Sequence, residues 1–304
     1  MHRAAGKLIV VGGPTASGKT ALAVRLAQRL GTVVVSADSR QFYHEMSIGV
    51  ARPSAAELAA APHYFIADRS VTEPLTAGQY AREALDLLNV LFHDHEVVVV
   101  AGGSGLYIRA LTEGFDAFPE TPKAIKEAIR SLYAAEGLAG LQGALQAVDP
   151  VYYDLVDRQN PARLMRALEV CQATGQPYSS FRSGQRVERP FRASFHYIDR
   201  PREELYDRIN TRVDLMFEQG LEAEARQLYA LRHLSPLQTV GYQELFEYFE
   251  GKYDLETARE RIRQHSRQYA KRQLTWLRRD GYWKPWAPEI LLSDDVDDQA
   301  FLPD

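Results

Sequence analysis

The sequence of 304 residues predicts an α/β protein in which a doubly wound parallel sheet is interrupted by an all-helical insertion domain. Short apolar, β-branched runs recur along the chain, and helical or loop segments separate the first four of them, which predicts the sheet. In the middle of the chain, apolar residues recur only at helical spacing, and a further strand-like run follows. This order predicts a helical insertion in the α/β core. We expect the core at residues 1–115 and 190–304, and the insertion at 116–189.

The expected strands are short and rich in valine and isoleucine. They are residues 8–11, 32–36, 64–66, 96–100 and 195–198. The clearest helix between them is 79–92, where Tyr80, Ala84 and Leu88 lie four residues apart. Alternation of strands with helices is typical of a parallel sheet covered on both faces.

Later segments of the chain carry mostly helical spacing. From residue 122 to about 180 no strand-like run occurs. Two long helices are expected at 203–231 and 254–279. The end of the chain from residue 281 is rich in proline and aspartate, and we expect it to be loose.

A glycine-rich loop joins the first expected strand to a helix. It fits the P-loop pattern G-x-x-x-x-G-K-[ST] with Gly13, Pro14, Thr15, Ala16, Ser17, Gly18, Lys19 and Thr20. Loop amides and a helix N-terminus converge in such a loop, and Lys19 adds a positive charge, so a di- or triphosphate fits there. The core is therefore expected to be P-loop NTPase-like. A chance match in a glycine-rich turn is the alternative, and the loop does not tell an energy source from a substrate.

Two other strand ends should lie beside this loop, because ligands of parallel sheets bind beyond the carboxyl ends of strands. Asp38 follows the second run and could ligate Mg²⁺, accept a proton from the group being modified, or only cap the next helix. The fourth run ends in Gly102, Gly103 and Ser104, where P-loop hydrolases usually carry a metal-binding aspartate. The glycines suit a close approach of backbone to a ligand, although a tight turn also explains them.

Arginines gather on the two long helices. Arg208 and Arg212 share one helix face and could clamp an anionic group or pair with neighbouring acids. Arg263, Arg267 and Lys271 follow at the same spacing on the last helix, with acids nearly absent around them. Like charges in a row repel one another, so this stripe favours contact with a phosphodiester backbone.

Two further segments suit contact with RNA. A second basic cluster in the insertion contains Arg163 and Arg166. Residues 238–243 form a loop of hydrogen-bonding side chains around the ring of Tyr242, which suits stacking on an extruded base. The net charge of −4 argues against a nucleic-acid binder, but the distribution of charge is the better guide.

Composition excludes several classes of protein. The single cysteine, Cys171, rules out an intramolecular disulfide and a cysteine zinc cluster. No apolar run approaches the roughly 18 residues needed to cross a bilayer. The N-terminal residues lead directly into a core strand, so we expect no signal peptide, no membrane partner and a cytoplasmic protein.

The motifs together closely resemble those of the tRNA dimethylallyltransferase family over roughly residues 8–279. They occur in order as GPTASGKT at 13–20, SADSRQFY at 36–43, AGGSGLYIRAL at 101–111, NPARLMRALEV at 160–170, TVGYQEL at 239–245 and QYAKRQLTWLR at 268–278. The P-loop alone is generic, whereas the ordered set is specific. One departure is SIGVARP at 47–53, where the family commonly has DIGTAKP, so the role of this segment stays open.

The resemblance implies a prenyl transfer. Dimethylallyl diphosphate would give its five-carbon group to N6 of adenosine 37, in tRNAs reading codons that start with U, and diphosphate would leave with the help of Mg²⁺. The P-loop residues would hold the diphosphate of the donor, with Arg208 beside them. Asp38 matches the general base, Thr20 the hydroxyl near the bridging oxygen and a ligand for Mg²⁺, and Arg212 the diphosphate-binding arginine.

The resemblance also implies where the tRNA anticodon stem-loop is held, partly by the helical insertion. The matching positions are Asp38, Ser39, Arg40, Gln41, Ser104, Ala162, Arg163, Leu164, Met165, Arg166, Gln238, Thr239, Val240, Gly241, Tyr242 and Gln243, to which the basic stripe adds Arg263, Arg267 and Lys271. We expect a monomer. The alternatives are a P-loop small-molecule kinase, which the long basic helix disfavours, and a nucleotide-binding module that holds RNA without chemistry.

Overall fold

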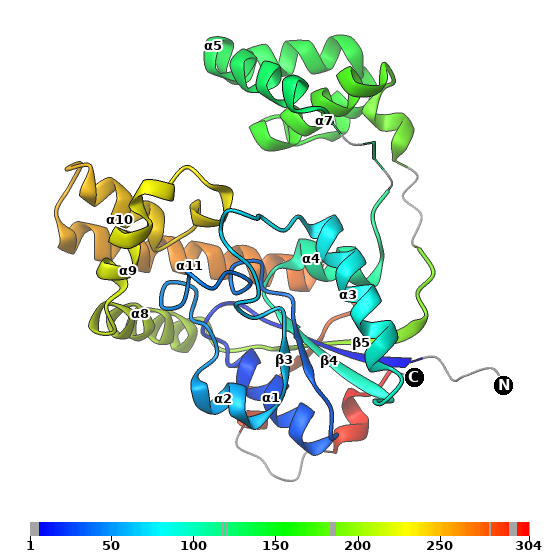
Figure 1. Ribbon diagram of the computed structural model, residues 1–304, viewed down its shortest axis with the longest axis vertical. Coiled ribbons are helices and arrows are strands. Elements are labelled where there is room, and N and C mark those ends of the chain that lie inside the picture. Colours follow the sequence, from blue (N-terminus) through cyan, green and yellow to red (C-terminus); the bar gives the residue numbers. More distant parts are fainter. Residues whose placement is uncertain are drawn as a thin grey trace. The chain divides into compact units, whose positions relative to one another are not determined.

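The computed structural model describes residues 6–116, 118–119, 121–182, 187–279, 281–291 and 297–303. The chain forms two compact units. Unit 1 is Met1–Gly114 together with Glu188–Asp304, and unit 2 is Phe115–Val187. Unit 1 contains the sheet, and unit 2 is built from helices (Figure 1).

The sheet of unit 1 has six parallel strands in the order β3-β2-β4-β1-β5-β6. Their bounds are β1 Gly6–Gly12, β2 Val34–Ser36, β3 His63–Tyr64, β4 Val97–Gly102, β5 Phe191–Ile198 and β6 Lys284–Trp286. Strand β1 lies between β4 and β5, and its apolar run is buried on both faces. The predicted doubly wound parallel sheet is confirmed.

Helices cover both faces of this sheet. Leu8 and Val10 of β1 belong to the core formed with α3 (Ala77–Leu91), α4 (Gly105–Thr112) and α11 (Leu255–Arg279). Ile9 and Val11 point to the opposite face and pack with α1 (Lys19–Arg29). Short helix α2 (Ala55–Ala60) begins at Ser54, which forms a capping box with Glu57.

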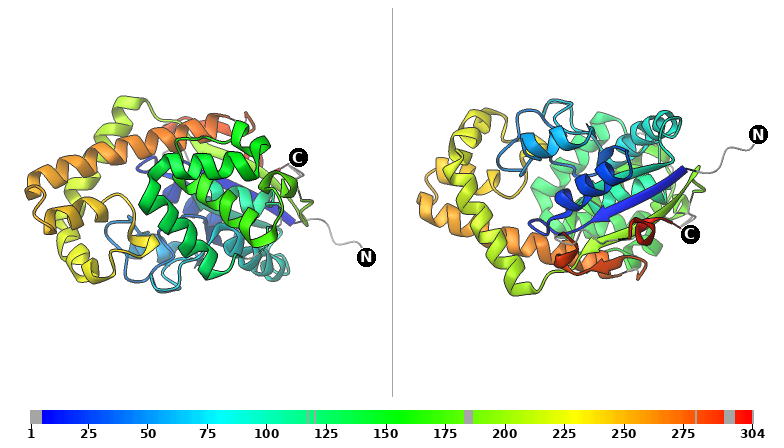
Figure 2. Two further views of the ribbon diagram at one scale, coloured as in Figure 1. Left: turned by 90° about the horizontal axis from the view of Figure 1, so that it is seen from above. Right: turned by 90° about the horizontal axis from the view of Figure 1, so that it is seen from below.

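The helix predicted at 203–231 is wrong in its length. The structure has α8 (Arg202–Glu218) and α9 (Leu221–Leu228), separated at Gly220, whose φ of 100° breaks the helix and suits glycine. Helix α10 (Tyr242–Phe249) follows, and α11 agrees with the predicted helix at 254–279. These four helices gather at the carboxyl end of β1, as the right-hand view of Figure 2 shows.

The C-terminal segment was predicted to be loose, and its described part is instead ordered against β5. Strand β6 and two 3₁₀ turns, Pro288–Leu291 and Asp298–Phe301, lie there. Phe301 is fully buried, and its carbonyl accepts hydrogen bonds from Ser194 Oγ and His196 Nε2. Pro285 is tolerated because β6 is an edge strand. Residues 280, 292–296 and 304 lie outside the described residues.

In the described residues of unit 2, all regular structure is helical. Its helices are α5 (Lys123–Val148), which is kinked at Gly137, α6 (Pro150–Leu155) and α7 (Pro161–Thr174). The side chain of Asn160 caps α7, and the proline that follows suits the first helical position. The unit has its own core, which includes Ile129, Leu141 and Leu168. In the parts of both units that the structure describes, no helix is long and apolar enough to span a bilayer.

Candidate active site

A cavity of about 430 Å³ opens beyond the carboxyl ends of β1 and β2 in unit 1, beside β4. The strand register aligns these ends, because Gly12 pairs with Gly102 and Ser36 pairs with Ala101. The predicted site residues that line the cavity are Thr15, Ala16, Gly18, Lys19, Thr20, Asp38, Arg40, Gln41, Arg208, Arg212, Thr239, Val240 and Gly241. The fold thus brings together residues from distant motifs.

Hydrogen bonds from two arginines, one just before α8 and one within it, hold the P-loop in shape. Gly13, Pro14 and Ser17 are buried behind the lining residues of the loop. Ala16 has a φ of 64°, unusual for a residue with a side chain, and Arg208 Nε donates to its carbonyl oxygen at 2.9 Å. Arg200 Nε donates to the carbonyl oxygen of Ser17 at 2.7 Å. Arginine side chains therefore fix the conformation of this loop.

The interpretation of Arg208 and Arg212 as an ordinary surface pair is wrong. Arg212 lies in the cavity wall, and its Nη1 is 3.4 Å from the hydroxyl of Thr15. Glu204, one of the acids that could have paired with them, forms an ion pair with Arg200 instead. Both predicted arginines therefore face the P-loop.

Cations crowd the P-loop end of the cavity. Burial lowers the pKa of Lys19, an effect that Arg212 adds to and Asp38 opposes. Burial likewise lowers the pKa of Arg212, helped by Arg208 and opposed by Glu57 and Asp38. Desolvated cations next to one another gain stability when an anion binds between them, so this end of the cavity suits a diphosphate.

Asp38 lines the cavity and interacts electrostatically with Lys19 of the P-loop. Its Oδ1 accepts a hydrogen bond from the amide of Arg40 at 3.2 Å, and its own amide donates to Ser36 Oγ at 3.3 Å. The next helix, α2, is capped by Ser54, so the alternative that Asp38 only caps a helix is wrong. One carboxylate oxygen of Asp38 instead accepts a hydrogen bond within a local turn. This contact does not compete with a catalytic role, because a carboxylate has about four acceptor positions.

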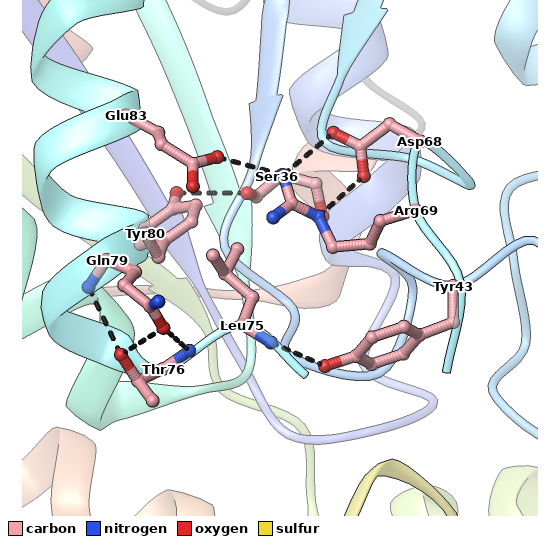
Figure 3. A network of polar contacts seen from close by, with 9 residues as sticks. All are labelled: Ser36, Tyr43, Asp68, Arg69, Leu75, Thr76, Gln79, Tyr80 and Glu83. Atoms are coloured by element: carbon pink, nitrogen blue, oxygen red, sulfur yellow. Dashed lines mark hydrogen bonds and ion pairs between the residues drawn. The ribbon is translucent and has the colours of Figure 1, made fainter. Parts of the chain in front are cut away.

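The chain before and after Asp38 is supported by α3 (Figure 3). The hydroxyl of Tyr80 donates to the carbonyl oxygen of Ser36 at 2.9 Å. The amide of Leu75 donates to the hydroxyl of Tyr43 at 3.1 Å, and Arg69 pairs with Glu83 of α3. These contacts tie the segment that carries Asp38 to a helix packed on the sheet.

Gln273 of α11 is a site residue that sequence reasoning missed. Its Oε1 accepts from the amide of Thr15, and its Nε2 donates to the carbonyl oxygen of Gly103, both at 2.9 Å. A Cβ at Gly103 would lie 2.3 Å from Gln273 Nε2, so a side chain there would displace the Gln273 amide from this contact. The signal in the sequence was one polar residue on the otherwise apolar face of α11, within the motif at 268–278.

Several predicted RNA contacts make hydrogen bonds within the chain. Ser39 and Ser104 bond to each other at 3.0 Å. Arg40 donates to the carbonyl oxygens of Ser235 and Pro236, and Gln41 donates to those of Val50 and Ala51. Arg40 and Gln41 still line the cavity, whereas the two serines join β4 to the segment after β2.

The predicted stacking role of Tyr242 is wrong. Its side chain is fully buried in the core, and its hydroxyl donates to Glu224 Oε1 at 2.6 Å. Burial and the neighbouring carboxylate both raise its pKa. Gln238 and Gln243 bond to each other, so this loop presents Thr239, Val240 and Gly241 to the cavity rather than an aromatic ring.

The segment at 47–53, which departs from the family pattern, forms one wall of the cavity. Glu224 of α9 accepts hydrogen bonds from the amides of Ser47, Ile48 and Gly49 at 2.9 to 3.0 Å. Backbone amides and a carboxylate thus hold the segment in place of side chains, which explains why it tolerates Ser47. The wall residues of this segment include Ile48 and Val50.

Apolar side chains form much of the cavity wall. On α8, Ile209 and Val213 each follow an arginine directly, and Leu215 and Met216 come next, so one helix supplies both cations and apolar groups to the wall. The apolar lining residues are Ile48, Val50, Ile209, Val213, Leu215, Met216, Val240 and Ile262. The cavity is therefore amphiphilic, with an anion-binding end and an apolar wall.

The sequence suggests that the basic stripe of α11 has almost no acids near it. The structure instead places acidic side chains beside its arginines. Arg263 forms ion pairs with Asp214 of α8 and Glu260, and Arg267 contacts Asn210 and Glu260. These arginines join α11 to α8, and their interpretation as a one-signed surface is wrong. Lys271 is exposed.

Five predicted RNA contacts belong to unit 2. Ala162 and Arg163 are exposed at the start of α7, and Met165 and Arg166 are partly buried. Leu164 is fully buried in the core of unit 2, so its side chain does not face a ligand, and an RNA contact through its backbone stays a prediction. Arg166 donates to the hydroxyl of Thr121 and lies 5.8 Å from the ring centroid of Phe118.

Comparisons with known proteins show which family the chain resembles. A family model described as IPP transferase matches residues 41–280. The tRNA dimethylallyltransferase of Cytophaga hutchinsonii is 47% identical over 281 residues, which cover 92% of each chain. The tRNA dimethylallyltransferase 1 of Bacteroides thetaiotaomicron is 46% identical, with 93% of this chain and 92% of that protein covered.

A solved structure is similar over the same extent. The crystal structure of the full-length tRNA isopentenylpyrophosphate transferase from Bacillus halodurans is 32% identical, with a TM-score of 0.69. The match covers 97% of this chain and 93% of that chain. The fold, the ordered motifs and these matches over nearly full length lead to one conclusion: the chain belongs to the IPP transferase family.

Proposed function

We propose that this chain transfers the dimethylallyl group of dimethylallyl diphosphate to N6 of adenosine 37, in tRNAs that read codons starting with U, and releases diphosphate. The observation that carries the proposal is the amphiphilic cavity. A prenyl diphosphate has an anionic head and an apolar tail, and the P-loop end and the apolar wall match these two parts. Relatives that are named for this reaction support the proposal.

The cationic end of the cavity would bind the diphosphate. Lys19, Arg208 and Arg212 line it together with the amino end of α1. Negative charge grows on the diphosphate as the allylic C–O bond breaks, and cations already in place stabilise that charge without rearranging. Thr20 supplies a hydroxyl near the start of α1, where the bridging oxygen would lie.

Asp38 would act on the acceptor. The N6 amine of adenine is a poor nucleophile because its lone pair is delocalised into the ring, so a proton must leave N6 as the new C–N bond forms. Asp38 lines the same cavity as the P-loop and interacts with Lys19, which suits a base that takes this proton. The bond formed is N6–C, the bond broken is C–O, and diphosphate carries away the electron pair.

Mg²⁺ fits this site only with most of its ligands coming from outside the protein. Among the described residues, no group of three or more His, Cys, Asp or Glu side chains could hold a metal ion. The hydroxyl of Thr20 would be a protein ligand, with diphosphate oxygens and water completing the shell. When bound, Mg²⁺ would neutralise charge on the diphosphate.

The RNA would reach the cavity by extrusion of the target base, which costs a few kcal/mol. Contacts of cavity residues with the base, and of Arg163 and Arg166 in unit 2 with the anticodon stem-loop, would offset this cost. The chain would act as a monomer. We place this activity in the cytoplasm, where tRNA is modified.

Incubation with dimethylallyl diphosphate, Mg²⁺ and a tRNA with adenosines at positions 36 and 37 tests the proposal. Mass spectrometry of the digested tRNA should find one added dimethylallyl group on adenosine 37. A matched tRNA with guanosine at position 37 should stay unmodified. Turnover of ATP without prenyl transfer would contradict the proposal and support a small-molecule kinase.

A further inference from the structure

The RNA-facing part of the cavity needs a surface for the extruded base. A base that leaves its stack loses the contact of its flat faces, and proteins commonly replace that contact with an aromatic ring. Among the described residues that line the cavity, Tyr269 is the one aromatic side chain. Tyr242, the ring that the sequence suggested, is buried and bonded to Glu224.

Tyr269 reaches the cavity because of its place on α11. Ile262, Ser266, Tyr269 and Gln273 all line the cavity, and their spacing of four, three and four places them on one face of the helix. Gln273, one turn after Tyr269, is bonded to Thr15 of the P-loop and to Gly103. The backbone that carries Tyr269 is therefore held in a fixed relation to the donor end.

The surroundings of Tyr269 suit a base better than a structural contact. The residue remains 36% exposed although it lines a cavity. Arg272 lies 5.8 Å from the ring centroid. Burial and the carboxylate of Asp38 raise the pKa of Tyr269 to about 12, with Arg40 and Arg272 opposing, so the phenol is neutral at physiological pH. The ring thus lies within electrostatic reach of Asp38.

We propose that Tyr269 is the platform on which the extruded adenine stacks, with its N6 amine directed to Asp38. The assignment rests on the proposed function, because it takes the target base to be adenosine 37. It gives the reaction an orienting contact that none of the predicted residues supplies.

Kinetics of Tyr269 variants test the assignment. Tyr269→Leu should lower kcat/KM for tRNA by roughly 5- to 150-fold, since removal of one stacking ring costs about 1–3 kcal/mol. Tyr269→Phe should stay near the wild type, and the KM for dimethylallyl diphosphate should not change in either variant. Tyr206→Leu is the matched control, because Arg202 lies 5.1 Å from that ring, as Arg272 does near Tyr269, and Tyr206 does not line the cavity.

Photocrosslinking gives a second measurement that does not depend on turnover. An anticodon stem-loop with 8-azidoadenosine at position 37 should label a peptide that contains Tyr269. Labelling of residues 238–243 instead, or a Leu variant equal to the wild type in kcat/KM for tRNA, would overturn the assignment of Tyr269 alone. A wild-type enzyme that binds RNA but transfers no prenyl group would overturn the proposed function, and the crosslink would still decide the place of the base.

Discussion

Asp38 takes part in two kinds of contact, and they differ in what they need from the side chain. One carboxylate oxygen accepts from the amide of Arg40, which an amide oxygen could also do. Proton transfer from N6 needs a base, which an amide is not. A conservative substitution therefore separates the structural contact from the proposed chemistry.

We expect Asp38→Asn and Asp38→Ala to lower kcat for prenyl transfer by at least 10²-fold, the usual contribution of a general base. Affinity for tRNA should stay within a few-fold of the wild type. Single-turnover kinetics and a filter-binding assay measure the two quantities. An Asn variant that retains most of its rate would show that another group takes the proton.

Among elements, the contact between β5 and the C-terminal segment depends on the charge of one buried histidine. Trp286 Nε1 donates to His196 Nδ1 at 3.0 Å, so the ring is neutral and carries its proton on Nε2 toward the carbonyl of Phe301. Burial lowers the pKa of His196 to about 4, below its ordinary value of 6.5. If Nδ1 were protonated, two N–H donors would face each other, and the hydrogen bond from Trp286 would be lost.

Acid should therefore weaken the fold through His196. Between about pH 6.5 and pH 4 the unfolded chain binds a proton that the folded chain does not, so stability is full above this window and falls as pH falls. The loss should reach about 3 kcal/mol, from 1.36 kcal/mol per pKa unit. Urea unfolding of the wild type and His196→Phe, measured across pH 4–7, tests this. Parallel pH profiles for the two proteins would contradict it.

Elements with strong patterns could be predicted from the sequence, and those fixed by distant partners could not. The P-loop and the valine-rich strands carry local signals. Strand β6 has three residues with a proline in the middle, and it exists because β5 offers an edge and Phe301 fills the space behind it. The acids that neutralise Arg263 include Asp214, far away in the chain, so no local pattern could show this pairing.

In the candidate site too, residues with local sequence signals could be predicted, and those placed by tertiary packing could not. Asp38, Lys19 and Arg212 come from motifs with their own signals, and the fold brings them to one cavity. Tyr269 and Tyr242 look alike in the sequence, and only packing decides that the first lines the cavity and the second fills the core. Burial of a particular ring depends on tertiary contacts, which spacing does not determine.

For the whole molecule, we propose that unit 2 contributes part of the affinity for RNA while the chemistry takes place in unit 1. The cavity belongs to unit 1, and Arg163 is an exposed cation of unit 2. We expect Arg163→Glu to raise the KM for tRNA. The slope of log affinity against log salt concentration should become shallower by about 1, the amount that one phosphate contact contributes. The kcat and the KM for dimethylallyl diphosphate should not change.

Binding titrations from 50 to 200 mM salt measure this effect. Arg82→Glu is the control, because it changes the net charge equally on the exposed side of α3. Equal weakening by both variants would mean that total charge, and not a contact by unit 2, controls affinity.

The central position of β1 in the sheet has a consequence for synthesis of the chain. Gly6 is the first residue of β1, and it pairs with Phe191 of β5. The ribosome synthesises Phe191 only after α4 and all of unit 2. At about 5–20 residues per second, a ribosome leaves one edge of β1 without its neighbour for about 10 to 40 s. The nascent chain therefore presents an open apolar strand edge while unit 2 folds, the interval in which a chaperone would have the most to protect.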